Sequence, residues 1–143
     1  MPPRPALRRH PAVLAAGLAA IIESAMGAIV TTDDAQRIVL FNCAAEEMFR
    51  CPRGQALGAP LERFIPSRLR EAHRRHIERF ARTGVTSRRM GETPALSGLR
   101  ADGEEFPIEA SISQVALDGR RYFTAIVRDI TPRMQARASG RRR

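Results

Sequence analysis

The chain has 143 residues, which is enough for one domain with a single core but too few for an additional catalytic domain. Its formal net charge is +9, yet the excess lies at the two ends: residues 1–10 carry three arginines and residues 133–143 carry five, with no acid in either segment. Residues 11–132 are therefore close to neutral. Every basic side chain is arginine, whereas a phosphate-binding surface normally also uses lysine, so we expect no nucleic-acid binding.

The chain ends have too few apolar groups to offset the entropy lost on ordering, so residues 1–11 and 133–143 are predicted to be disordered basic arms. Between them we expect one domain, residues 12–132, with an N-terminal amphipathic helix over 12–24 and a core over 25–132. The run RRHPAVLAAGLAAIIESAMGA imitates a signal peptide. Glu23 interrupts its apolar stretch well before the length that spans a bilayer, so no membrane span is expected.

The cysteines and the motif content argue against a catalytic or metal-cluster protein. Cys43 and Cys51 lack the spacing of a zinc site or a redox pair, which favours a reduced, cytoplasmic protein. Cys43 is predicted to be an ordinary buried side chain. The sequence has no phosphate-binding glycine loop, no nucleophile elbow and no paired-carboxylate motif, so we expect no enzyme and no catalytic residues.

The first half of the domain predicts a hairpin followed by helices. The segments GAIVTTD and RIVLFN are rich in β-branched and apolar residues and are joined by the turn DDAQ. Asn42 is placed to cap a short helix, CAAEEMF, and CPRGQALGAP is expected to contain one more helical turn. A long helix follows in IPSRLREAHRRHIERFART, with Pro66 near its start and Gly84 just past its end.

The second half predicts three strands in a meander. TSRRMGETPALSGLR is an irregular entry into the third strand, and ADGE is a tight turn. The next segment, EEFPIEASISQVAL, alternates with period two, so that one face carries Phe106, Ile108, Ala110 and Ile112. A turn at Asp118–Gly119 leads into RRYFTAIVRDIT. The predicted fold class is therefore α+β.

The long helix carries two of the three histidines, His73 and His76. At about 100° per residue, both fall on the apolar face together with Leu69, Ile77 and Phe80. The opposite face is rich in arginine and glutamate. A histidine on an apolar face is most often a core residue with satisfied ring nitrogens, and the competing interpretation is that it binds a cofactor.

The order helix, two strands, helices and three strands resembles the PAS domain family over about residues 18–132. DAQRIVLFNCAAEEMF resembles the family's second strand and its N-x-A-x-E-x-x-F helix, GLRADGEEFPIEASIS its fourth-strand signature, and YFTAIVRDIT its final strand ending in D-I-T. The resemblance implies a five-stranded antiparallel sheet flanked by helices, with a pocket on one face. It also implies a sensory or interaction role without catalysis, as in bacterial two-component-like regulation.

Within that family, IPSRLREAHRRHIERF is similar to the corresponding segment of haem-binding, oxygen-sensing PAS domains. The resemblance implies that His73 lies at the position of the proximal haem ligand, and that a distal side chain comes from Met90 or the two arginines before it. Flavin is not expected, because the N-C-R-F cysteine motif of light-sensing PAS domains is missing. The predicted metal ligand is His73, and the predicted cofactor-binding residues are His73, His76, Leu69, Ile77 and Met90.

The leading functional hypothesis is a ligand-responsive signalling module, with haem and a diatomic gas such as oxygen as its sharpest form. Such a module would pass its signal to a separate output protein. The alternative is a ligandless PAS module for protein–protein interaction. In either case we expect a homodimer that depends on residues 12–24. A third hypothesis, an arginine-tailed binder of nucleic acid or membrane surfaces, would require steeply salt-dependent binding.

Overall fold

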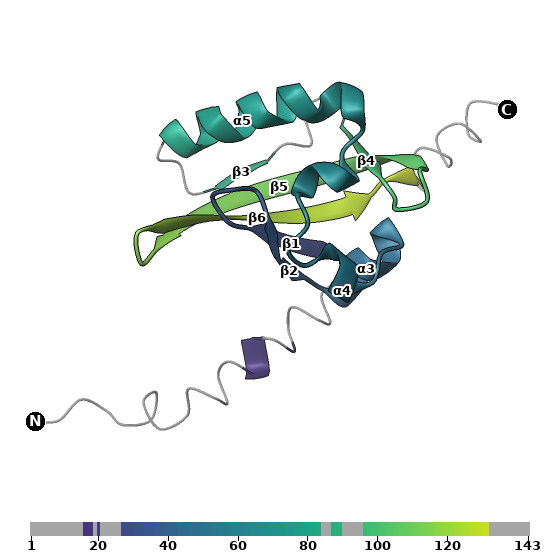
Figure 1. Ribbon diagram of the computed structural model, residues 1–143, viewed down its shortest axis with the longest axis horizontal. Coiled ribbons are helices and arrows are strands. Elements are labelled where there is room, and N and C mark those ends of the chain that lie inside the picture. Colours follow the sequence, from purple (N-terminus) through teal and green to yellow (C-terminus); the bar gives the residue numbers. More distant parts are fainter. Residues whose placement is uncertain (1–15, 19, 21–26, 84–86, 90–95, 132–143) are drawn as a thin grey trace, which may run out of the picture.

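The computed structural model describes residues 16–18, 20, 27–83, 87–89 and 96–131 (Figure 1). Its strands are β1 (Ala28–Thr32), β2 (Ile38–Phe41), β3 (Ser87–Arg89), β4 (Ser97–Leu99), β5 (Glu105–Leu117) and β6 (Arg120–Asp129). The helices after β1 are α3 (Cys43–Phe49), α4 (Arg53–Ala56) and α5 (Arg70–Thr83), with 3₁₀ turns η1 (Leu61–Phe64) and η2 (Ser67–Leu69). Residues 16–18 and 20 are helical, while the rest of the predicted helix over 12–24 and both basic arms lie outside the described residues, so these predictions remain untested.

The sheet is antiparallel, and its main path runs β2-β1-β6-β5-β3. The short strand β4 pairs with β5 at Glu105–Pro107, whereas β3 pairs with β5 at Ser111–Ser113. The predicted third strand is therefore divided into two pieces that share one partner. The prediction of a five-stranded antiparallel sheet flanked by helices is confirmed.

The helices pack where the sequence pattern directs them. In Figure 1, α5 extends across one side of the sheet, and α3 and α4 lie near β1 and β2. Asn42 caps α3 as predicted, since its Oδ1 accepts the N–H of Ala45 at 3.0 Å. The same oxygen accepts the N–H of Ile29 at 2.9 Å, and Nδ2 donates to the carbonyl of Gly27 at 3.2 Å. One buried side chain thus fastens the start of α3 to β1.

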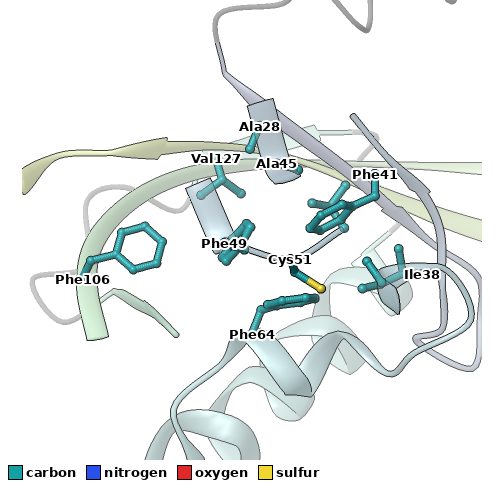
Figure 2. Packing of buried hydrophobic residues seen from close by; sticks show 11 residues of the cluster. Ala28, Ile38, Phe41, Ala45, Phe49, Cys51, Phe64, Phe106 and Val127 are labelled. Atoms are coloured by element: carbon teal, nitrogen blue, oxygen red, sulfur yellow. The ribbon is translucent and has the colours of Figure 1, made fainter. Parts of the chain in front are cut away.

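The core has two groups of buried apolar side chains. In the larger group, shown in Figure 2, the ring of Phe64 lies 5.5 Å from that of Phe41 and 4.9 Å from that of Phe49, measured between centroids. Cys51 lies among these rings. The smaller group joins α5 to the sheet and consists of Ile77, Phe80, Ile112 and Phe123. Helix α5 is therefore held by a contact region of its own.

The two cysteines differ in exposure, and Cys43 does not match its prediction. Cys43 is exposed, so the prediction that it is buried is wrong. It is the first residue of α3, directly after the Asn42 cap, and its Sγ lies 3.8 Å from Nη2 of Arg53. Cys51, between α3 and α4, is the buried cysteine. Among the described residues, no helix is long and apolar enough to cross a membrane.

The end of β6 is anchored by a buried arginine. Arg100 is 8% exposed, and its Nη2 donates to Asp129 Oδ2 at 2.9 Å. Its guanidinium lies 3.8 Å from the centroid of the Phe106 ring, and Nη1 donates to the carbonyl of Met48. The turn before β5, the helix α3 and the last residue of β6 therefore meet at one side chain.

Candidate functional site

A cavity of about 240 Å³ lies between the two groups of core side chains. The walls come from α5, from the segment around η1 and from the face of the sheet that α5 covers. Ala110 of β5 and Ala125 of β6 both line it, and their short side chains leave room over the middle of the sheet. The lining is mainly apolar, which is typical of sites that take small molecules.

Most of the site residues predicted from the sequence lie on this cavity. Ile77 is buried, Leu69, His73 and His76 are half-buried, and all four line the wall formed by η2 and α5. Residues four apart on a helix share a face, which brings Leu69, His73 and Ile77 to one side. Met90 and the side chains of the two preceding arginines lie outside the described residues. That these residues bind a cofactor stays a prediction.

Burial keeps His73 uncharged at neutral pH. Loss of hydration lowers its pKa from 6.5 to about 4; the carboxylate of Glu62 opposes this shift and His76 adds to it. Glu62 is itself paired with Arg74, whose Nη2 donates at 3.0 Å, and this hydrogen bond lowers the pKa of Glu62. A neutral imidazole has a ring nitrogen with a free lone pair, which can accept a hydrogen bond or ligate a metal.

The sequence analysis missed four polar residues of the described cavity lining, namely Thr32, Gln36, Ser97 and Ser111. Thr32 lies at the end of β1 on the same face as Ala28 and Val30, so strand alternation could have placed it in the core. Gln36 belongs to the turn between β1 and β2, and no sequence pattern indicates that its side chain reaches the cavity. The site therefore has a polar wall in addition to its histidines.

A second hollow, of about 360 Å³, adjoins the first. Gln36, Leu61, His73, Ile77 and Phe123 line both of them, so these side chains separate an inner cavity from an outer groove. The remaining side chains of the outer groove are mostly charged and include Asp34, Glu62, Arg74, Glu78 and Arg121. Polarity thus increases from the inner cavity outward.

Comparison with known proteins assigns the fold to a family. The profile of the PAS fold matches residues 22–135. The chain belongs to the PAS family. PAS domains are sensory, non-catalytic modules, and the position of the cavity between α5 and the sheet agrees with the pocket that the sequence resemblance implied.

The chain is similar to two sensor proteins. It is 32% identical over 121 residues to the sensor protein FixL of Bradyrhizobium diazoefficiens, covering 85% of this chain and 24% of FixL. It is 30% identical over 115 residues to the oxygen sensor protein DosP of Escherichia coli, covering 80% of this chain and 14% of DosP. The chain thus spans less than a quarter of the length of either relative.

The fold also matches solved structures. A PAS domain from a two-component sensor histidine kinase has a TM-score of 0.69 to this chain at 18% identity. The match covers 84% of this chain and 99% of that domain. At this level of identity the likeness concerns the fold.

Proposed function

We propose that this PAS domain is a sensory module that binds haem in the cavity beneath α5, with His73 as the iron ligand. One observation carries the proposal: His73, at the position that resembles the proximal ligand of haem-binding PAS domains, lines an apolar cavity as a neutral imidazole. Haem iron held by one histidine supplies a site for a diatomic gas such as oxygen. The similarity to a protein named as an oxygen sensor supports this class of signal.

The residues beside His73 suit its role as an iron ligand. Because the pKa of His73 is about 4, no proton competes for its ring nitrogen at neutral pH. Leu69 and Ile77, one helical turn before and after His73, provide apolar walls beside it. These walls shield part of the ring from water, and His76 adds a further polar group on the same wall.

The cavity is connected to the end of the domain through β6. Phe123, Ala125 and Val127 of this strand line the cavity, and Asp129 at its end is held by Arg100. A ligand that repositions the cavity walls can therefore bias the last residues of β6. We expect a separate output protein in the cytoplasm to receive this change.

The proposal is tested by titrating haemin into the purified full chain and recording its absorption. A sharp Soret band at one haem per chain is expected. His73→Gly should abolish the band, and free imidazole added to this variant should restore it by replacing the missing ligand. His76→Ala and His10→Ala are the matched controls and should retain a Soret band. Stoichiometric binding by His73→Gly without imidazole would contradict the assignment.

The second candidate function is a ligandless interaction module. It is favoured by apolar side chains on the side of the sheet away from the cavity, where Val115, Leu117 and Ile126 are 56%, 59% and 46% exposed. Exposed apolar surface of this kind commonly marks a site of protein association. An absence of haemin binding by the wild type would leave this interaction role as the better account.

A further inference from the structure

The inner cavity has a polar corner formed by Thr32 at the end of β1 and Gln36 in the turn that follows. The Thr32 hydroxyl and both polar atoms of the Gln36 side chain, Oε1 and Nε2, are buried and have no hydrogen-bond partner among the described residues. Thr32 is only 2% exposed. Buried polar groups in folded proteins are nearly always paired, so these atoms indicate a partner other than the described residues.

The backbone holds Gln36 at this corner. Its φ is +61°, in the left-handed region that is unfavourable for residues with a side chain. Its N–H donates to the carbonyl of Asp33 at 3.0 Å, and its own carbonyl accepts the N–H of Leu61 at 3.0 Å. The turn is thereby fastened to η1, and an unfavourable conformation is maintained that places the Gln36 side chain on the cavity.

The inner cavity suits an uncharged group. Its described lining contains no aspartate, glutamate or arginine, and its histidine beside the groove, His73, is neutral. A charged group placed there would lose its hydration and would find no aspartate, glutamate or arginine in the described lining as an ion-pair partner. Gln36 and His73 also line the outer groove. The charged side chains of that groove do not line the inner cavity. A ligand can therefore reach the corner from the groove while its buried part stays neutral.

We infer that Thr32 and Gln36 form a binding subsite for an uncharged ligand group with a hydrogen-bond donor and acceptor side by side, as in a primary carboxamide or a lactam, attached to an apolar body. The Gln36 amide offers an acceptor and a donor in one plane and so pairs with both atoms of such a group. The Thr32 hydroxyl supplies an additional contact, and the apolar walls take the body. This subsite goes beyond the proposed haem site, since it requires no ligation by His73.

The test uses benzamide as a probe on the ¹⁵N-labelled full chain without haemin. Three related compounds separate the contributions: acetophenone keeps only the acceptor, benzoate adds a charge, and toluene has neither polar atom. Benzamide is expected to bind at least about tenfold more tightly than each of the others and to shift the side-chain amide resonances of Gln36. Equal binding of benzamide and toluene would mean an apolar hole alone and would overturn the inference.

Variants locate the contact. Gln36→Leu should reduce benzamide affinity to that of toluene, and Thr32→Val should weaken it. Gln36→Leu should also raise the melting temperature, because it removes buried polar groups that lack partners. Gln55→Leu, at an exposed position of α4, is the control and should bind benzamide like the wild type. Unchanged benzamide affinity in Gln36→Leu would overturn the subsite.

The haem proposal and this inference fail separately. If the wild type shows no Soret band with haemin but distinguishes benzamide from toluene, the haem proposal falls and the subsite stands. If haemin binds through His73 and benzamide shows no preference over toluene, the subsite falls and the haem proposal stands.

Discussion

At the scale of single residues, the partly desolvated imidazole of His73 makes the stability of the ligand-free protein depend on pH. Its pKa is about 4 in the folded chain against an ordinary 6.5, so below pH 6.5 the unfolded chain takes up a proton that the folded chain does not. This stabilisation is complete above pH 6.5 and is lost as the pH falls toward 4. We expect a loss of about 2 kcal/mol in unfolding free energy between pH 7 and pH 5 from this group.

Urea denaturation at a series of pH values, followed by circular dichroism, measures this loss. Glu62 and His76 also act on the pKa of His73, and Arg74 is paired with Glu62, so a variant is needed to isolate the contribution of His73. His73→Gln lacks the titrating group and should lose about 2 kcal/mol less than the wild type over the same interval. Identical losses in the two proteins would show that His73 is not buried as a neutral group.

The orientation of single residues could be predicted only where a regular period applies. The helical period correctly placed His73, His76 and Ile77 on one wall, and strand alternation could have placed Thr32. Gln36 could not be found in this way, because its position depends on a left-handed turn and on a hydrogen bond from Leu61, far along the chain. Cys43 was misjudged because the general preference of cysteine for burial does not take its place in the helix into account, and as the first residue of α3 it is exposed.

At the scale of elements, Asn42 is expected to be the side chain on which the junction of β2 and α3 depends. It is fully buried, caps α3 and binds both the N–H of Ile29 and the carbonyl of Gly27. Asn42→Ala removes the cap and takes away the hydrogen-bond partner of the half-buried Ile29 N–H and Gly27 carbonyl, so it should cost about 3 kcal/mol of unfolding free energy. Urea denaturation is the measurement.

The matched control is Glu47→Ala, which changes an exposed position in the middle of the same helix. It should alter the unfolding free energy by no more than about 0.5 kcal/mol, because surface substitutions away from caps and networks have small effects. A similar small effect for Asn42→Ala would mean that the cap and the link to β1 are dispensable.

The sequence predicted the presence of the helices and strands better than it predicted where a strand is divided and how the strands pair. Turn residues and alternation gave the β1–β2 hairpin, the α3 cap and the β5–β6 meander, because each depends on neighbours in the chain. The split of the third strand into β3 and β4 depends on pairing with two distant parts of β5, which a local pattern does not encode. The same long-range pairing defines which alanines, Ala110 and Ala125, lie over the cavity.

At the scale of the whole molecule, the cavity between the two groups of core side chains is open space. A larger apolar side chain that fills this space should raise the unfolding free energy. Ala125 lines the cavity and pairs with Ile112 in the sheet. Ala125→Leu extends an isobutyl group into the open space, which should raise the unfolding free energy by about 1 to 2 kcal/mol through added apolar burial. The same change should block haemin binding, measured as loss of the Soret band.

The control for this substitution is Ala116→Leu, at an exposed position of β5. It should leave both the stability and the haemin titration nearly unchanged. Retention of a normal Soret band in a well-folded Ala125→Leu protein would show that the cavity is not where haemin binds.

The face of the sheet away from the cavity is expected to form a homodimer with a second copy of the chain. Val115 and Leu117 of β5 alternate with the inward-facing side chains, and Ile126 pairs with Ser111 on the same outer face, next to Ile29. These apolar residues are exposed together on a face of the sheet, while residues 16–18 and 20, in the predicted N-terminal helix, are also exposed. A second copy covering this face would remove apolar surface from both chains.

Ile126→Glu places a charge in the middle of that face and should convert the dimer to monomer, because burying an unpaired carboxylate is costly. Deleting residues 1–24 should have the same effect if the N-terminal helix belongs to the interface. Sedimentation velocity at micromolar concentration distinguishes the two states. Leu57→Glu, at an exposed apolar position next to α4, is the control and should remain dimeric. A monomeric wild type would contradict the predicted dimer. A dimer that persists in Ile126→Glu would exclude this face as the interface, and the chains would then associate through another surface.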